Sequence, residues 1–187
     1  MAEMKTDMGG AAAVIGAMSV LPAVAPKVRV RGYLPMTDNM LGGDATRPGD
    51  VLTIRNGKTI EVLNTDAEGR LILADALSLA SEAKPDAIVD LATLTGACMV
   101  ALGPDIAGLM GRNDGFLVQV EEAAKRAGER VWRLPLPDDY RESFRSPVAD
   151  MKNIGGTYGG ALTAGLILGE FVAEGIPWAH LDIAGPA

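Results

Sequence analysis

The chain has 187 residues, enough for one sizeable core, and its 48% apolar and 22% charged residues are ordinary for a globular protein. Its 17 basic and 24 acidic residues give a net charge of −7, which repels phosphate backbones and disfavours a nucleic-acid partner. The single cysteine, Cys98, excludes a disulfide framework, favours a reducing compartment and is expected to be a buried, inert thiol.

The first predicted element is a helix over residues 4–20 that is stopped by Pro22. No charge occurs from residue 8 to residue 26, a length that could nearly span a bilayer. The segment is rich in Ala and Gly, however, and the residues before it are net acidic where a signal peptide needs positive charge. We therefore expect a buried, tightly packed helix and no membrane association.

The next segments predict a strand, a loop and a hairpin. Residues 27–35 alternate apolar and basic side chains, which is the pattern of a strand, and the Gly- and Asp-rich residues 37–50 predict a loop. Residues 51–63 contain two β-rich arms around Asn56-Gly57, the dipeptide most typical of a type I′ turn. This pattern predicts a β-hairpin just ahead of the most polar motif in the chain.

The remaining segments alternate strands with helices. The nearly continuous apolar run at residues 87–94 predicts a strand that is buried on both faces. The other expected elements are helices or helical turns at 71–83, 119–127, 139–144 and 161–173, strands at 106–110 and 178–185, and a glycine-rich loop at 153–160. This order predicts an α/β fold with a mixed, mostly buried sheet that is flanked by helices on both faces.

The stretch NTDAEGRL, residues 64–71, places three charged side chains two residues apart between apolar segments. One interpretation is a capping box, in which Thr65 and Glu68 close the start of a helix while Asp66 pairs with Arg70. The glycine inside that first turn does not fit, because glycine weakens a helix interior. This interpretation explains every charge in the stretch without any chemistry.

The second interpretation keeps the same stretch extended, so that Asp66, Glu68 and Arg70 share one face. They would project from the carboxyl end of a strand, where ligands bind in open α/β sheets. Adjacent carboxylates repel each other unless a cation lies between them, which predicts a divalent metal, and an arginine beside that metal suits an anion. The local pattern leaves the two interpretations about equal.

NTDAEGRL is also the signature of the leucyl aminopeptidase (cytosol aminopeptidase) family, which the chain resembles nearly end to end. The matching segments, in family order, are EMKTDMGGAAAV, RPGDVL, IEVLNTDAEGRL, DLATLTGAC, WRLPL, ADMKNIGG, ALTAGLIL and WAHLDIAGPA. The resemblance implies a dimetal α/β catalytic domain that removes N-terminal residues, preferably leucine, from peptides by metal-activated water. It also implies two divalent ions, Mn or Zn, a homo-hexamer and a cytoplasmic location.

The resemblance implies site roles residue by residue. Asp7, Asp66 and Glu68 match metal ligands, and Asp66 also offers its backbone carbonyl. Arg70 matches the active-site arginine, which in the family holds a bicarbonate that helps to activate the attacking water. The expected substrate pocket comprises Met4, Thr93, Leu94 through its backbone, Gly96, Ala184 and Ala187.

The resemblance further implies that part of the family's site has no match here. The upstream family segment supplies a metal-binding lysine, a bridging aspartate and a catalytic lysine, and the family also has an N-terminal domain and final helices. We therefore expect residues 1–187 to be a partial metallo-aminopeptidase catalytic domain, truncated at both ends and inactive alone. The alternative is a DNA-binding, regulatory or structural role for a relative with a decayed catalytic centre.

Two further features carry weaker signals. His180 and Asp182 could together ligate a metal, but a structural histidine on a buried strand is the expected role. The glycine-rich loop at residues 153–160 has no P-loop lysine after it. We expect this loop, and Lys152 before it, to lie near the active site.

Overall fold

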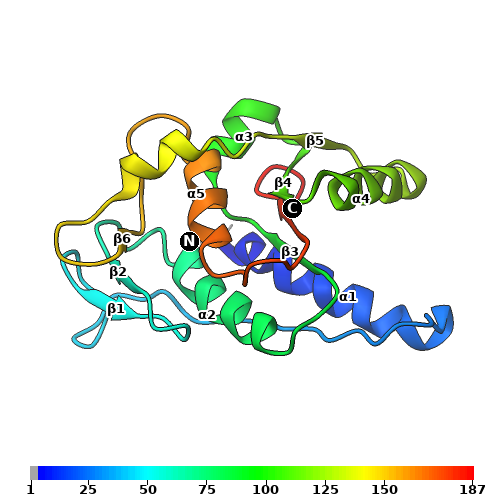
Figure 1. The fold of residues 1–187 in the computed structure, drawn as a ribbon, viewed down its shortest axis with the longest axis horizontal. Helices are drawn as coiled ribbons and strands as arrows, with labels where there is room; N and C mark the ends of the chain where they lie inside the picture. The colour runs from blue at the N-terminus through cyan, green and yellow to red at the C-terminus, as the bar shows by residue number, and fades with distance from the viewer. Residues whose placement is uncertain (1–3) are drawn as a thin grey trace.

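The computed structural model describes residues 4–187, which form two sheets with helices packed around them (Figure 1). The elements in chain order are η1 (Met4–Met8), α1 (Gly9–Val24), β1 (Val51–Thr53), β2 (Thr59–Glu61), α2 (Gly69–Glu82), β3 (Ile88–Ala92), α3 (Gly96–Leu102), β4 (Ala107–Arg112), α4 (Asp114–Ala127), β5 (Val131–Arg133), η2 (Asp138–Phe144), β6 (Met151–Lys152), α5 (Gly160–Gly169) and β7 (Trp178–Asp182). The two η elements are 3-10 helices.

The larger sheet has four strands in the order β3-β7-β4-β5. It is mixed, because β7 runs parallel to β3 and antiparallel to β4, while β5 runs parallel to β4. Neighbouring residues of β7 point to opposite faces: Trp178 belongs to the cluster with α2 and α5, and Ala179 to the cluster with α4. Helices therefore flank both faces of a mixed sheet, which confirms the predicted fold class.

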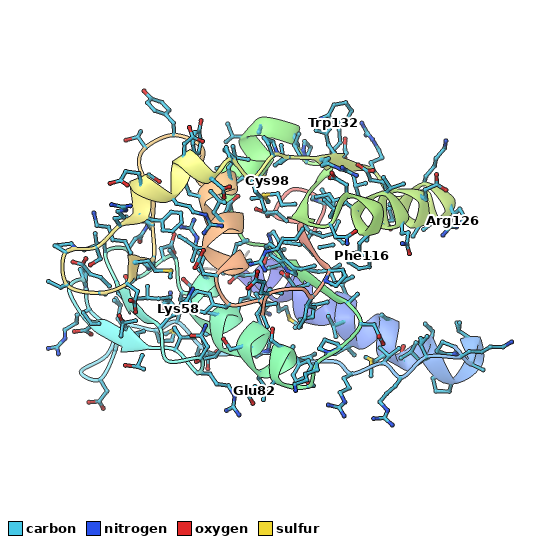
Figure 2. The ribbon with its side chains drawn as sticks, viewed as in Figure 1. Lys58, Glu82, Cys98, Phe116, Arg126 and Trp132 are labelled. Atoms are coloured by element: carbon cyan, nitrogen blue, oxygen red, sulfur yellow. The ribbon has the colours of Figure 1, made fainter. Side chains whose placement is uncertain are left out.

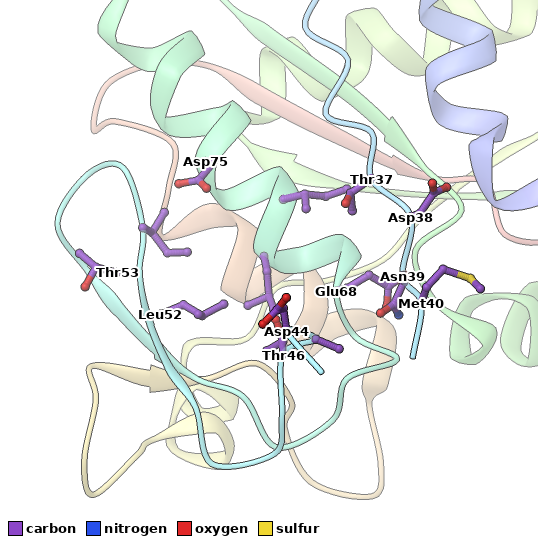
Figure 3. A pocket seen from close by; sticks show the side chains of 14 residues that line it. Thr37, Asp38, Asn39, Met40, Asp44, Thr46, Leu52, Thr53, Glu68 and Asp75 are labelled. Carbon is purple, nitrogen blue, oxygen red and sulfur yellow. The ribbon is translucent and has the colours of Figure 1, made fainter. Parts of the chain in front are cut away.

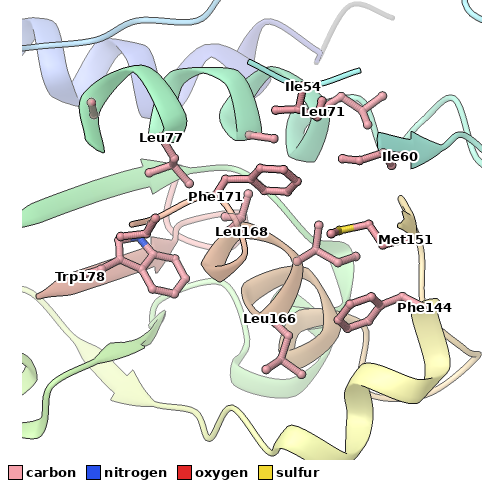
Figure 4. Packing of buried hydrophobic residues seen from close by; sticks show 14 of the residues in the cluster. Ile54, Ile60, Leu71, Leu77, Phe144, Met151, Leu166, Leu168, Phe171 and Trp178 are labelled. Atoms are coloured by element: carbon pink, nitrogen blue, oxygen red, sulfur yellow. The ribbon is translucent and has the colours of Figure 1, made fainter. Parts of the chain in front are cut away.

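The main core lies around α5, between α2 and the strands (Figure 4). α5 contributes Leu166 and Leu168, α2 contributes Leu71 and Leu77, and β7 contributes the fully buried Trp178. Burying each such side chain stabilises the fold by roughly 1.5–3 kcal/mol. This packing fixes the first turn of α2, where the NTDAEGRL stretch ends, against the centre of the molecule.

A smaller sheet has three strands in the order β1-β2-β6. β1 and β2 form the predicted antiparallel hairpin. The prediction of a type I′ turn is wrong. Such a turn needs a positive φ at both central residues, and Gly57 has a φ of 90° whereas the φ of Asn56 is not positive. The turn closes instead through the Gly57 N–H, which donates to the Ile54 carbonyl at 2.7 Å. β6 runs parallel to β2 and brings a distant segment beside the end of the hairpin.

α1 differs from its prediction in extent and in burial. It continues through Pro22 and ends at Val24; the next residue, Ala25, has a left-handed φ of 46°, and its N–H donates to the Leu21 carbonyl. Pro22 lies in the last turn, where its missing N–H removes only one helix bond. Among the residues of α1 only Gly10 is buried, so the prediction of a buried, tightly packed helix is wrong. Its first turn packs on β3, and its far end extends from the body (Figure 1).

The same N-terminal region meets the simplest criteria for a membrane span. Within residues 4–187, one helical stretch, Met4–Val24, is long and apolar enough to cross a membrane by length and composition. Core helices and signal sequences share those two properties. Length and composition therefore do not assign this stretch to a membrane.

Two strand predictions are wrong. Residues 27–35 form no strand, and Val28 is exposed, because no other segment among the described residues pairs with them. β3 is not buried on both faces, since Val89 is 46% exposed and only β7 pairs with β3 within residues 4–187. An apolar or alternating pattern describes side chains, but a strand also needs a backbone partner.

The predicted helices are present with shifted ends. α4 begins at Asp114 rather than at residue 119, because Asn113 caps it by accepting the Phe116 N–H at 3.0 Å. α5 ends at Gly169 instead of residue 173. β5 and β6 were not predicted, because strands of three and two residues carry almost no periodicity. The remaining predicted strands and the turn at η2 lie where the pattern places them.

Gly10 allows α1 to approach β3, and we expect Gly10→Ala to destabilise the protein by about 1–3 kcal/mol. A Cβ at this position would lie 2.2 Å from the Leu91 carbonyl oxygen, so the helix would have to move away from the strand. Thermal unfolding of both variants would measure the effect. Gly16→Ala is the control, since nothing lies within 4 Å there and alanine favours a helix by roughly 0.5–1 kcal/mol. Equal midpoints for the two variants would contradict this role of Gly10.

Candidate functional site

The NTDAEGRL stretch adopts neither of the two predicted conformations. It is not extended, because residues 65 and 66 form a turn and α2 begins at Gly69. It is not a capping box either, because Glu68 occupies the N-cap position with no side-chain cap bond. The turn is closed locally by the Asn64 side chain, which accepts the Asp66 N–H at 2.9 Å. Asp66 and Glu68 therefore lie on an irregular turn of residues 62–68, the acidic turn, and Arg70 lies in the first turn of α2 that follows it.

The electrostatic environment of Glu68 in this turn is perturbed. Burial raises the pKa of its carboxyl group, its own backbone hydrogen bond lowers it, and the charges of Asp7 and Asp66 raise it further. One carboxylate oxygen, Oε2, is buried and has no hydrogen-bond partner among residues 4–187. Asp66, two residues before Glu68, and Asp7, which precedes Asp66 by 59 residues, therefore both act on the Glu68 carboxylate.

Asp7 is positioned by the segment that follows β3. The Thr93 hydroxyl donates to the Asp7 carboxylate at 2.9 Å and lies 3.0 Å from the Asp7 carbonyl. A Cβ at Gly9 would lie 3.0 Å from the Ala187 Cβ and 3.2 Å from Thr93, so these residues are close neighbours. Thr93 therefore contacts Asp7, and Thr93 and Ala187 both lie beside Gly9.

Arg70 points away from the exposed face of the turn. Its Nη1 donates to the Asn153 carbonyl at 2.7 Å, and its Nε is buried with no partner within the described part of the chain. Burial lowers the pKa of the guanidinium, and the charge of Asp182 opposes that shift. The predicted ion pair with Asp66 is wrong, because Arg70 is turned toward the residues after β6. A cation with an unused N–H donor remains beside the acidic turn.

Asp182 organises the segment that carries the other expected pocket residues. Its buried carboxylate accepts the N–H groups of Leu94, Thr95 and Ala184 at 3.2, 3.3 and 3.2 Å, and the Thr95 hydroxyl at 2.7 Å. Gly96 follows at the start of α3. One carboxylate at the end of β7 therefore holds two loops whose residues were expected to line the substrate pocket.

The pocket candidate Met4 lies on η1 and is 65% exposed. A separate cleft of about 460 Å³ borders Glu68 between the 37–46 loop, β1 and the start of α2 (Figure 3). Asp38, Asp44 and Asp75 also line this cleft, so its wall is acidic. An acidic wall next to Glu68 raises the local concentration of cations.

His180 and Cys98 have structural surroundings. The His180 Nδ1 and the Trp178 Nε1 each lie 2.6 Å from a carboxylate oxygen of Asp90, and His180 is fully buried. Burial lowers the pKa of His180, but Asp90 raises it above its ordinary value. The Cys98 thiol lies inside the molecule (Figure 2), and burial raises its pKa to about 11. A buried, largely protonated thiol is a poor nucleophile, as the sequence predicts.

The donor set of the acidic turn suits divalent cations, because hard metals prefer carboxylate and carbonyl oxygens. The orphaned Oε2 of Glu68 and the mutual repulsion of its neighbours fit a missing positive charge. Within residues 4–187, however, no three His, Cys, Asp or Glu side chains are gathered closely enough to hold a metal ion. The described residues therefore match part of a metal-binding shell.

Fold and site together define an α/β protein with an oxygen-rich, acidic centre beside a buried arginine. The whole chain, residues 1–187, matches the model of the cytosol aminopeptidase family, catalytic domain. The chain belongs to that family.

Similar proteins cover nearly all of this chain. It is 59% identical over 184 residues to a probable cytosol aminopeptidase of Streptomyces avermitilis and 58% identical over 185 residues to one of Synechococcus sp., with 98% and 99% of the chain covered. A mutant of tomato leucine aminopeptidase has a TM-score of 0.92 at 50% identity over 98% of the chain, or 36% of its own. The bottromycin maturation enzyme BotP in complex with Mn has a TM-score of 0.95 at 48% identity, covering 98% and 41%. The chain spans 36% of the length of these two curated relatives.

Sequence reasoning expected the loop at residues 153–160 near the site and weighed Asp182 only as a metal ligand, but it missed the hydrogen bonds by which Asp182, Asn153 and Asn39 hold the site in place. The Asn39 side chain donates to the Thr65 carbonyl at 2.9 Å. Asn153 accepts the N–H of Leu63, which lies 90 residues earlier in the chain. Each lies in a segment far from NTDAEGRL, with no local pattern that distinguishes it from a loop or strand-end polar residue. The pairing of β6 with β2 brings Asn153 to the site, and the pairing of β7 with β3 brings Asp182 there.

Proposed function

We propose that the complete protein is a metal-dependent aminopeptidase that removes N-terminal residues, preferably leucine, from peptides. The observation that supports this most is that the charges of Asp7 and Asp66 act on Glu68, whose buried Oε2 has no partner among the described residues, in a chain of the cytosol aminopeptidase family. Their acidic oxygens suit divalent ions, and a relative of known structure is in complex with Mn.

Asp7, Asp66 and Glu68 would hold two divalent ions, Mn or Zn, together with ligands from outside residues 4–187. Such ions lower the pKa of a bound water and polarise a carbonyl. The residues of this chain position those ligands: Thr93 fixes the Asp7 carboxylate by its hydroxyl, and the first turn of α2 fixes Glu68. The separation of the three acids in sequence makes their geometry depend on tertiary packing.

Arg70 would bind an anion beside the acidic turn, either bicarbonate or the developing charge on a substrate oxygen. Its free Nε and the desolvation of its guanidinium support that role, since a poorly solvated cation interacts strongly with an anion. Thr93, Leu94, Gly96, Ala184 and Ala187, with Met4, would form the substrate pocket. The Asp182 carboxylate would keep the loops of that pocket at a fixed distance.

The wider setting follows from the family. We propose a cytoplasmic location without membrane association, in line with the names of the curated relatives, and also a homo-hexamer. We also infer that residues 1–187 alone hold an incomplete site, because the chain spans 36% of those relatives and its acids do not close a metal-binding cluster among the described residues. The DNA-binding alternative gains no support, since the chain is acidic.

Hydrolysis of leucine amide with added Mn²⁺ or Zn²⁺ tests the proposal. We expect release of leucine by the full-length protein, loss of that activity with a chelator, and little or none from residues 1–187 alone. A matched amide that lacks the free α-amine should not be cleaved. No turnover by the full-length protein with either metal would refute the function, and robust chelator-sensitive turnover by residues 1–187 would refute the incomplete site.

A further inference from the structure

Asn153 is the first residue after β6, and its side chain and backbone are fully buried. Its N–H donates to the Glu61 carbonyl at 3.0 Å and so continues the parallel pairing of β6 with β2. This pairing carries Asn153 to the point where the hairpin strand ends and the acidic turn begins. A buried asparagine must find partners for both its carbonyl and its NH₂ group, which limits where it can be tolerated.

The Asn153 side chain satisfies the backbone of the turn before Glu68. Its Oδ1 accepts the N–H groups of Leu63 and Asn64 at 2.9 and 3.3 Å. Its Nδ2 donates to the carbonyls of Asn64 and Ala67 at 2.6 and 3.5 Å. One amide therefore pairs with the turn at its start and again on the residue that precedes Glu68.

The backbone carbonyl of Asn153 also accepts the Nη1 of Arg70 at 2.7 Å. The same residue thus ties down both ends of NTDAEGRL, with Asp66 and Glu68 between the two attachments. No helix or strand holds residues 62–68, so these bonds replace the regular pairing that the segment lacks. Loss of the amide would leave the N–H groups of Leu63 and Asn64 and the carbonyls of Asn64 and Ala67 without this partner, and the carboxylates free to separate.

We propose that Asn153 is a positioning residue of the site. It holds the acidic turn and Arg70 in the arrangement that binding of metal and substrate requires. The inference rests on the proposed function, because it assigns the turn to metal binding. Asn153 itself touches neither ion nor substrate; it acts through the backbone of residues 63–67 and through the Arg70 side chain. Removal of a residue that orients a metal ligand without touching the metal typically lowers metal affinity or activity by about 10–100-fold.

The test compares Asn153→Ala and Asn153→Asp with wild type in the full-length protein. Electron paramagnetic resonance of free Mn²⁺ gives the dissociation constant, leucine amide gives kcat and KM, and calorimetry gives Tm. We expect Asn153→Ala to weaken Mn²⁺ binding by about 10–100-fold at a temperature well below its Tm. Asn153→Asp keeps the shape and the acceptor but replaces the donor to the Asn64 and Ala67 carbonyls with an oxygen, so we expect it to weaken Mn²⁺ binding as well.

Asn113→Ala is the matched control. Asn113 caps α4 at a φ of 70°, so its replacement lowers Tm by the loss of a cap and by backbone strain, far from the turn. The proposal requires an unchanged Mn²⁺ dissociation constant in this control. Wild-type Mn²⁺ affinity and kcat in a folded Asn153 variant would overturn the positioning role. Absence of Mn²⁺ binding and turnover in wild type would instead overturn the proposed function on which it rests.

Discussion

Glu68→Gln in the full-length protein is expected to lower Mn²⁺-dependent leucine release by more than about a hundredfold. This loss exceeds the range of about 10–100-fold that is typical when a residue that only orients a metal ligand is removed. The neutral amide offers a weaker oxygen donor than a carboxylate, and it removes one of the charges that would balance a cation. Metal-free protein should lose little stability, because burial and the charges of Asp7 and Asp66 already oppose the ionised form of Glu68. Activity and calorimetry measured together separate these two effects.

Glu82→Gln is the matched control for this substitution. Glu82 lies at the opposite end of α2 and pairs with Arg55 across an exposed ion pair of 2.8 Å. Exposed pairs of this kind contribute about 0–1 kcal/mol, so activity should stay at the wild-type level. If Glu68→Gln binds Mn²⁺ with wild-type affinity, this carboxylate is not a metal ligand and the turn has only a structural role.

Asp182→Ala should reduce the free energy of unfolding by about 3 kcal/mol or more, because several buried donors lose a charged acceptor at once. The affected groups are the N–H groups of Leu94, Thr95 and Ala184 and the Thr95 hydroxyl. Arg70 would also lose the negative charge that opposes the effect of its burial. Urea unfolding of the 187-residue chain measures the loss without any metal present.

Asp105→Ala provides the comparison for Asp182. Asp105 is exposed and lies 3.7 Å from Arg130 in a surface ion pair, so its removal should change stability by less than about 1 kcal/mol. If Asp182→Ala unfolds at the same urea concentration as Asp105→Ala, the carboxylate does not hold the two loops together. In that case the positions of Leu94 and Ala184 must depend on packing alone.

Local patterns predicted most of the regular elements. Helices α2 and α4, the β1–β2 hairpin and the strands β4 and β7 follow from side-chain periodicity and turn residues, which act over a few neighbouring positions. The patterns failed where a partner was needed. Residues 27–35 alternate like a strand but pair with no segment among the described residues, and α1 is apolar along a length that mostly remains uncovered.

The site was only partly accessible to the same reasoning. The signature itself drew attention to Asp66, Glu68 and Arg70, yet both conformations inferred from its spacing were wrong. Its turn takes its shape from Asn64 within the stretch and from Asn39 and Asn153 outside it. A spacing argument treats neighbours along the chain, whereas these contacts cross 26 residues or about 90.

The sequence by itself determined the family, the α/β class and the identity of the charged residues, because these depend on residue types and their order. The tertiary structure alone decided how the charges are arranged. Parallel pairing of β6 with β2 delivers Asn153 to the turn, and the close approach at Gly10 delivers Asp7 to Thr93. Electrostatic and hydrogen-bond energies fall off over a few ångströms, so the character of Glu68 depends on which distant segments pack against it.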